Sequence, residues 1–288
     1  MTRRRRVVGA AALLLAGLAG LAAAMGFREA WADPVMRTLD VRVQGWPTEG
    51  APVRMALLSD IHLGGGAMDD ARLRWIVAQV NAVRPDLVLI AGDMIVGHDA
   101  SGAAPRAAGL QVPLSGLRAR LGVVAVLGNH DHWTAPAAIR QALEGAGVHV
   151  LTNTALRAGA VAIVGVDDAY SGHDDAAAAI AAWRRVGGVP ILLTHAPDLV
   201  HRLPRELTLV LAGHTHCGQV VLPGWGPLLL HAPQEHWRRL YDPQLRCGIV
   251  HQDGRTIVVT AGVGSGTMPI RLGAPPDWWL VTLHGRGG

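Results

Sequence analysis

The feature that most constrains this chain is a repeated pattern in which a short apolar run ends in a polar motif. Each run has the length and composition of a buried strand in an α/β domain: Met55–Leu58, Leu87–Ala91, Val123–Leu127, Ile191–Leu193 and Leu209–Ala212. The motifs that follow are, in chain order, Asp60-Ile61-His62, Gly92-Asp93, Gly128-Asn129-His130-Asp131, Thr194-His195 and Gly213-His214-Thr215-His216. Open α/β sheets bind ligands beyond the carboxyl ends of their strands, so these side chains should converge on one crevice.

The converging groups are carboxylates, imidazoles and one carboxamide, which suit divalent metal ions and outnumber the ligands of a single structural zinc. One carboxylate with ligands on both sides can bridge two ions, and ions about 3.5–4 Å apart serve phosphoester hydrolysis. Taken singly, each Asp or Asn could instead cap a turn, and each His could be an ordinary polar core residue. The fixed order of the five motifs favours the metal site.

These motifs resemble those of the calcineurin-like metallophosphoesterase family, whose pattern is D-x-H, G-D, G-N-H-[DE], H and G-H-x-H, and the resemblance covers roughly Val53 to Leu283. It implies an α/β fold, a sandwich of two mixed β-sheets flanked by helices. It also implies two divalent metal ions (Mn, Fe or Zn). The first ion would be held by Asp60, His62, Asp93 and His216. The second would be held by Asp93, Asn129, His195 and His214, with Asp93 bridging the two.

The resemblance also implies catalytic roles for two residues that bind no metal. His130 would stabilise phosphoryl charge or protonate the leaving oxygen, and Asp131 would orient His130 through its other ring nitrogen. The nucleophile would be a metal-bridging water or hydroxide. If the backbone is extended, Asp60 and His62 point the same way, as do His214 and His216.

Two residues outside the ligand set are candidate substrate contacts. Arg271 could pair with phosphate through its guanidinium, or it could belong to a structural salt bridge. His132 could contact substrate or lie on the surface. His98 and Asp99 stand on a predicted loop, Gly97–Pro113, where they could contact substrate, although a solvent-facing position is the simpler interpretation.

Composition excludes several classes of protein. The chain has 288 residues and no lysine, which rules out a Walker-type P-loop and a Schiff-base lysine. The formal charge of +4 matches the four arginines of Arg3–Arg6, so the remainder is close to neutral. A near-neutral body with one Phe and two Tyr argues against nucleic-acid binding.

The amino terminus predicts a membrane segment. Arg3–Arg6 precedes 19 uncharged residues, Val7–Met25, which as a helix span roughly 28 Å, close to the hydrocarbon thickness of a bilayer. The positive-inside rule then puts the rest of the chain outside the cytosol. We expect a single-pass protein of the bacterial inner membrane. Ala30-Trp31-Ala32 resembles a cleavage site, so an exported periplasmic protein remains an alternative, as does a body that faces the cytosol.

The expected domains are an anchor or export signal at 1–30, a connector with an edge strand (Leu39–Val43) at 31–52, and the phosphoesterase domain at 53–288. Further helices are predicted at Ala71–Val83, Pro136–Ala146 and Asp174–Val186, and further strands at Ala160–Val166, Thr256–Ala261 and Trp278–Leu283. Four tryptophans could line an apolar groove, rest on a membrane interface or pack in the core: Trp225, Trp237, Trp278 and Trp279. Cys217 and Cys247 are too few for a disulfide framework, and whether they pair stays open.

The carboxyl-terminal third contains Gly213–Val220, Leu222-Pro223, Gly262–Gly266, Pro269-Ile270-Arg271 and Pro275-Pro276. Together with the amino-terminal segment, these motifs resemble a small membrane-associated bacterial branch of the family, related to UDP-2,3-diacylglucosamine pyrophosphatases. The resemblance implies hydrolysis of a phosphoester or pyrophosphate bond in a cell-envelope lipid or nucleotide-linked lipid, by a monomer. One alternative is a phosphodiesterase or phosphatase with a soluble periplasmic substrate. Another is a non-catalytic envelope-binding module.

Overall fold

The computed structural model describes residues 3–43, 45–46, 51–232 and 235–285. The remaining positions, which include the first residues of the expected anchor, part of the connector and the last three of the expected domain, lie outside the described residues. All five apolar runs form strands.

The first six-stranded sheet contains three of the five motif-bearing strands. Its order is β1-β16-β2-β3-β4-β5. Neighbours pair in parallel except β16 with β2, which pair antiparallel. The strand bounds are β1 Val35–Val43, β2 Val53–Leu58, β3 Leu87–Ala91, β4 Val123–Val126, β5 Val148–Val150 and β16 Asp277–Gly285.

The second six-stranded sheet contains the other two, with the order β14-β15-β9-β8-β7-β6. Its four central strands are parallel, and the two edge strands, β14 and β6, are antiparallel to their neighbours. The bounds are β6 Thr154–Ala158, β7 Val161–Gly165, β8 Val189–Leu193, β9 Leu209–Ala212, β14 Gly248–Gln252 and β15 Arg255–Val259. Both sheets are therefore mixed, as the sequence predicted.

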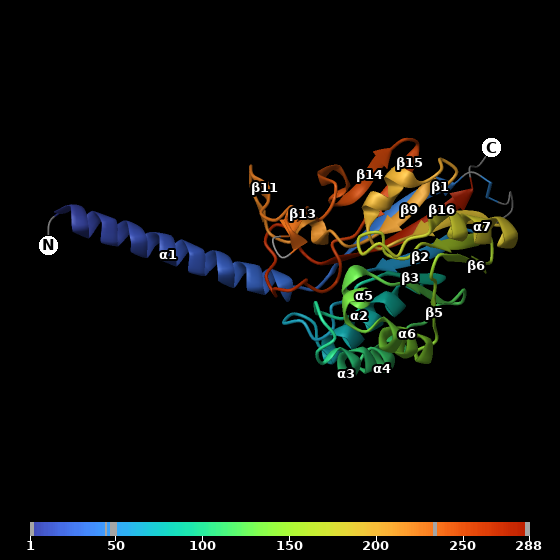
Figure 1. The fold of residues 1–288 in the computed structure, drawn as a ribbon, viewed down its shortest axis with the longest axis horizontal. Coiled ribbons are helices and arrows are strands. Elements are labelled where there is room, and N and C mark those ends of the chain that lie inside the picture. The colour runs from blue at the N-terminus through green and yellow to red at the C-terminus, as the bar shows by residue number, and fades with distance from the viewer. Residues whose placement is uncertain (1–2, 44, 47–50, 233–234, 286–288) are drawn as a thin grey trace.

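The two sheets pack face to face with helices outside them (Figure 1). Leu57 and Leu89 of the first sheet share a buried core with Ile191 and Leu211 of the second. Helices α2 (Asp70–Ala82) and α6 (Pro136–Gly145) cover the outer face of the first sheet, and α7 (Ala176–Val186) covers that of the second. The predicted sandwich is confirmed.

The loop predicted at Gly97–Pro113 is wrong in part. Two short helices, α3 (Ala103–Ala108) and α4 (Gln111–Leu114), interrupt it. Ala103, Ala107 and Leu110 are fully buried here. The run of alanines favours a helix, and their small side chains allow it to pack closely. The motif after β4 also continues as a short helix, α5 (Asn129–Thr134).

The amino-terminal helix α1 (Arg3–Ala30) projects from the domain (Figure 1). Its segment Val8–Ala30 has 23 residues and contains an 18-residue window with a mean hydropathy of 2.1, so it is long and apolar enough to cross a membrane. After it, β1 pairs with β16, so the connector strand is an integral part of the sheet and longer than predicted.

Two small hairpins lie between β9 and β14 in the chain, at the end of the domain next to α1 (Figure 1). One pairs β10 (Val221–Leu222) with β11 (Gly226–Pro227). The other pairs β12 (His231–Ala232) with β13 (Arg238–Arg239).

Candidate metal centre

The five polar motifs converge where β2, β3, β4, β8 and β9 end. Among the described residues, three overlapping groups bring potential metal-binding atoms within 4.8 Å of one another, and they combine Asp60, His62, Asp93, His130, His195 and His216. The chain positions that contribute span more than half of the sequence. Convergence at the strand ends follows from the parallel arrangement of the strands.

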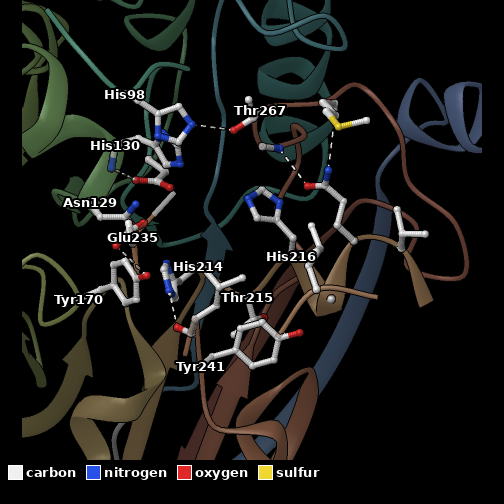
Figure 2. Close-up of a pocket in the computed structure, with 18 of the residues that line it drawn as sticks. His98, Asn129, His130, Tyr170, His214, Thr215, His216, Glu235, Tyr241 and Thr267 are labelled. Carbon is white, nitrogen blue, oxygen red and sulfur yellow. Dashed lines mark hydrogen bonds between the residues drawn. The ribbon is translucent and has the colours of Figure 1, made fainter. Parts of the chain in front are cut away.

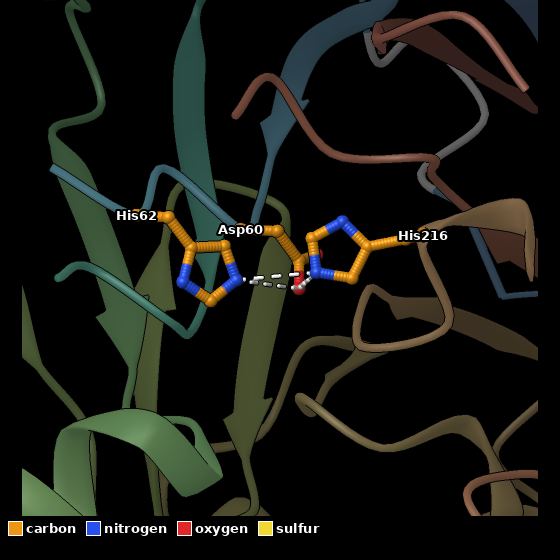
Figure 3. A group of neighbouring side chains, drawn as sticks. All are labelled: Asp60, His62 and His216. Atoms are coloured by element: carbon orange, nitrogen blue, oxygen red, sulfur yellow. Dashed lines mark hydrogen bonds and ion pairs between the residues drawn. The ribbon is translucent and has the colours of Figure 1, made fainter. Parts of the chain in front are cut away.

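Asp60, His62 and His216 form the first of these groups (Figure 3). The Nε2 atoms of His62 and His216 are 3.1 Å apart. Oδ1 of Asp60 lies 3.3 Å from Nε2 of His216 and 4.0 Å from Nε2 of His62. Three donor atoms therefore face one small volume.

Asp93, Asn129, His195 and His214 form the adjoining group. Oδ2 of Asp93 lies 3.3 Å from Nε2 of His195 and 3.5 Å from Nε2 of His62, between the two groups. Nε2 of His195 also lies 3.1 Å from Oδ1 of Asn129 and 3.2 Å from Nδ1 of His214. Asp93 thus occupies the position expected of a bridging carboxylate.

In both Asp60 and His195, hydrogen bonds engage one side-chain atom and leave another facing the site. The Ser59 hydroxyl and the His214 amide donate to Oδ2 of Asp60, and Oδ1 has no hydrogen-bond partner. Nδ1 of His195 donates to the Ala91 carbonyl at 2.7 Å, so its Nε2 is the ring nitrogen that faces the site. A buried, unpartnered carboxylate oxygen aimed at imidazole nitrogens fits a bound cation.

Burial keeps most of these imidazoles in the neutral form that binds metals. It lowers the pKa of His62 to about 3 and that of His214 to about 4. Burial also raises the pKa of Asp60 to about 6. For His195, burial acts to lower the pKa, but the Asp93 carboxylate outweighs it and raises that pKa well above its usual value. The donor set therefore fits two divalent ions.

The backbone at the motifs is not extended. Asp60, His62, Asp93, His214 and His216 all have positive φ, between 49° and 71°. The expectation that alternation along an extended chain aligns these side chains is therefore wrong. Left-handed conformations turn each side chain into the site, and such strain is found where function requires it.

Gly213 and Gly128 allow this close approach. A Cβ atom at Gly213 would lie 2.6 Å from Oδ2 of Asp60, and one at Gly128 would lie 2.3 Å from Oδ1 of Asp93. No side chain fits at either position.

His130 lies at the pocket, but its partner differs from the expected one. Its Nδ1 donates to the Gly97 carbonyl, which leaves Nε2 free. The Asp131 carboxylate instead accepts from the backbone amides of Asp93, Met94 and Gly128, at 2.8–2.9 Å. The expectation that Asp131 orients the His130 ring is wrong, because those three amides occupy its carboxylate. Asp131 ties the loops after β3 and β4 together.

Arg271 cannot contact substrate as it stands, since it is fully buried. Its guanidinium donates to the carbonyls of Ala261 (2.6 Å), Gly264 (2.6 Å) and Ala274 (2.9 Å). Its Nη2 lies 3.1 Å from Nδ1 of His216. The substrate prediction is wrong, and Arg271 holds the loop behind His216.

His132 is also turned away from the pocket. Its Nε2 pairs with Oδ1 of Asp167 at 2.8 Å, and its ring stacks on His173. The prediction of a substrate contact is wrong for this residue as well. The interpretation of His98 as solvent-facing misses its place in the pocket wall, where it bonds to Thr267 at 2.8 Å. The alternative that His98 faces the substrate site agrees with this position.

The metal-binding atoms open into a pocket of about 1050 Å³ (Figure 2). His98, Asn129 and His130 lie on one wall and His216 faces them. The rest of the lining is largely apolar, and includes Val220, Leu228, Leu229, Leu240, Met268 and Ile270. Trp278 and Trp279, considered for such a groove, are instead buried in the core.

A disulfide joins Cys217 to Cys247 directly after His216. Thr215 donates to the Arg246 carbonyl, and Arg246 donates to the Cys217 carbonyl, so the same turn is held at three points. The question that the sequence left open is settled in favour of pairing.

Comparison with known proteins agrees with this geometry. Residues 53–218 match the family model described as calcineurin-like phosphoesterase. The chain belongs to the calcineurin-like phosphoesterase family. This family uses a dinuclear divalent metal site, and the residues at the strand ends supply candidate ligands for one.

Several relatives have the same domain. A "Transmembrane protein with metallophosphoesterase domain" of Danio rerio is 30% identical over 91% of this chain, which spans 60% of that protein's length. An "Uncharacterized metallophosphoesterase" of Aquifex aeolicus is 28% identical over 88% of this chain and 95% of its own length. YkuE of Bacillus subtilis is 28% identical over 80% of this chain and 78% of its own. Helix α1 and the printed name of the Danio rerio relative both suggest a membrane protein.

Among solved structures, a 5'-nucleotidase precursor from Thermus thermophilus matches 81% of this chain and 55% of its own, with 17% identity and a TM-score of 0.45.

Proposed function

We propose that this enzyme hydrolyses a phosphoester or pyrophosphate bond in a cell-envelope lipid or nucleotide-linked lipid. The observation that carries the proposal is the composition of the pocket. Carboxylates and imidazoles form its base and apolar side chains form much of its wall. A phosphorylated head group suits the base, and a hydrocarbon chain suits the wall.

Seven residues would hold the two metal ions, Mn, Fe or Zn. The first ion would bind Asp60, His62, Asp93 and His216. The second would bind Asp93, Asn129, His195 and His214. When bound, such ions activate water at neutral pH and withdraw charge from phosphoryl oxygens.

The protein itself would supply proton transfer and positioning. In its imidazolium form, His130 would donate the Nε2 proton to the leaving oxygen while its Nδ1–H stays bonded to the Gly97 carbonyl. His98 would limit the width of the pocket mouth through its bond to Thr267. Asp131 would hold the loops that carry His130 and Asp93 in a fixed relative position, through the backbone amides that its carboxylate binds.

The proposed setting is the bacterial inner membrane, with a single span at 1–30, a connector at 31–52 and a monomeric catalytic domain at 53–288 outside the cytosol. The four arginines at the amino terminus support this orientation. The disulfide supports it as well, since disulfides persist outside the reducing cytosol. A retained span is favoured over cleavage because the last turn of α1 bonds to the domain, with the Gly26 carbonyl accepting from the Arg271 amide.

The test is metal content and Mn²⁺-dependent hydrolysis by the full chain in detergent, first with bis(p-nitrophenyl) phosphate and then with a panel of phospholipids. We expect about two metals per chain and cleavage of both substrate types. Asp93→Ala should lose metal and hydrolysis together, whereas the exposed Asp70→Ala should retain both. Cleavage of soluble esters alone would indicate a soluble periplasmic substrate. Bound metal without any cleavage would indicate a binding module.

A further inference from the structure

Five exposed apolar side chains lie on the segments 220–229, 235–240 and 266–270, parts of which line the pocket, and we call them the apolar rim. Their exposed fractions are 90% for Trp225, 57% for Leu228, 59% for Leu229, 68% for Trp237 and 56% for Met268. Leu228, Leu229 and Met268 line the pocket, whereas the two tryptophans do not. So many large apolar groups at one opening mark a surface that contacts something apolar.

The rim is tied to the end of α1 by a continuous set of backbone contacts. The Arg271 amide donates to the Gly26 carbonyl at 2.9 Å, and the Glu29 carboxylate accepts from the amides of Gly273 (3.2 Å) and Ala274 (3.0 Å). The loop at 268–274 that makes these bonds also carries Met268 of the rim.

The same loop holds the hairpin that carries three further rim residues. The Val221 amide donates to the Leu272 carbonyl at 2.7 Å, and the Leu228 amide donates to the Val220 carbonyl at 2.9 Å. Figure 1 shows β11 and β13 at the end of the domain from which α1 leaves. Four of the five rim residues, all except Trp237, are therefore held in a set position relative to the helix.

The length of α1 gives the level of the rim relative to a bilayer. Val8–Ala30 has 23 residues, which as a helix span about 34 Å, a little more than the roughly 30 Å hydrocarbon layer. The last turn, which bonds to the 268–274 loop, then lies at the level of the lipid head groups. Tryptophan is enriched at this level, and the exposed Arg238 and Arg239 after Trp237 suit lipid phosphates.

We propose that the apolar rim is a second membrane contact, which seats the pocket mouth on the outer surface of the same bilayer that α1 spans. A lipid substrate would then move from the head-group layer into the pocket without crossing water. This inference rests on the proposed function only in naming the lipid as substrate, because contact between the rim and the bilayer can be measured without turnover.

The experiment uses the full chain in nanodiscs of phosphatidylcholine and phosphatidylglycerol, with and without lipids brominated near the top of their acyl chains. Bromine quenches nearby tryptophans. Trp225→Phe and Trp237→Phe should each lower the brominated-lipid quenching of the total emission relative to the unchanged chain. The control is Trp183→Phe on α7, at the opposite end of the domain (Figure 1), which should raise the quenched share.

Equal quenching in all three variants and the unchanged chain would overturn the proposal. Two chains per nanodisc, with the rim tryptophans shielded from lipid by the second copy, would overturn it as well. Hydrolysis of bis(p-nitrophenyl) phosphate checks folding, because neither tryptophan lines the pocket and both variants should retain it. If quenching behaves as expected while no variant cleaves any ester, the rim inference stands and the proposed function fails.

Discussion

Arg271 offers the sharpest test of how this site is built, because the sequence and the structure assign it different roles. Arg271→Met keeps most of the side-chain volume and removes the guanidinium. Three backbone carbonyls at 2.6–2.9 Å would lose their buried donor. Leaving a buried polar group unpaired costs about 1–3 kcal/mol, so we expect a loss of about 3 kcal/mol or more.

For a domain of this size, 1 kcal/mol lowers Tm by about 2–4 °C, so the midpoint should fall by about 6–12 °C. The assay is thermal unfolding of the full chain in detergent, metal-free and with Mn²⁺. Because Nη2 lies 3.1 Å from Nδ1 of His216, metal affinity should fall as well. The exposed Arg74→Met, which loses only a surface ion pair with Asp70, is the control and should shift Tm little.

The opposite pattern would refute this reasoning. If Arg271→Met raised KM while Tm and metal content stayed unchanged, the guanidinium would be a substrate contact, and the buried arrangement would not represent the working enzyme. Arg271→Lys separates charge from geometry further. One ammonium cannot reach all three carbonyls, so it should recover part of the lost stability and no more.

Three further predictions concern the residues around the site. His130→Ala should retain both metals and lower turnover by about 10²–10⁴-fold, measured by metal analysis and steady-state kinetics; loss of metal would show that its role is structural. Cys247→Ser should lower the free energy of unfolding by about 3–4 kcal/mol, since the disulfide closes a loop of 30 residues. A reductant should lower the Tm of the unchanged chain to a similar extent and leave the Tm of the variant unaltered. Metal binding should release protons at pH 7, because Asp93 outweighs burial and raises the pKa of His195 well above its usual value. In the metal-free protein the His195–Asp93 pair stabilises the fold fully below about pH 6.5 and progressively less as pH rises through the raised pKa of His195. Mn²⁺ should therefore stabilise the protein more at pH 8.5 than at pH 6. Calorimetry in two buffers of different ionisation enthalpy measures the proton release, and the absence of any release would contradict the assignment.

Strand positions and the set of residues at the site follow from the sequence because both depend on local pattern. An apolar run such as Leu87–Ala91 specifies a buried strand by itself, and the structure has a strand with those same bounds. That Asp60, Asp93 and His195 meet at the strand ends then follows from strand direction, although the positive φ that turns Asp60 and Asp93 into the site does not. No knowledge of side-chain contacts was needed for either step.

Contacts between side chains and distant backbone could not be foreseen in this way. Asp131 stands beside His130 in the chain, yet its carboxylate faces three amides and the imidazole faces the Gly97 carbonyl instead. Arg271 has the charge of a phosphate ligand, and only the fold buries it. The pairing of Cys217 with Cys247 likewise depends on how the turn after β9 folds.

The pairing of β1 with β16 has a consequence for how the protein is made. Arg37 bonds to Asp277 across a separation of 240 residues, and β16 also lies between β1 and β2 in the sheet. Synthesis must therefore reach the last strand before the first one has a partner, and such non-local closure is slow. Until then β2 is an open edge, so a chain stalled before Asp277 should be a ready target for proteases and for aggregation. If the domain is exported, the interval before β16 arrives is spent outside the cytosol. During that interval α1 would hold the unfinished domain at the membrane surface.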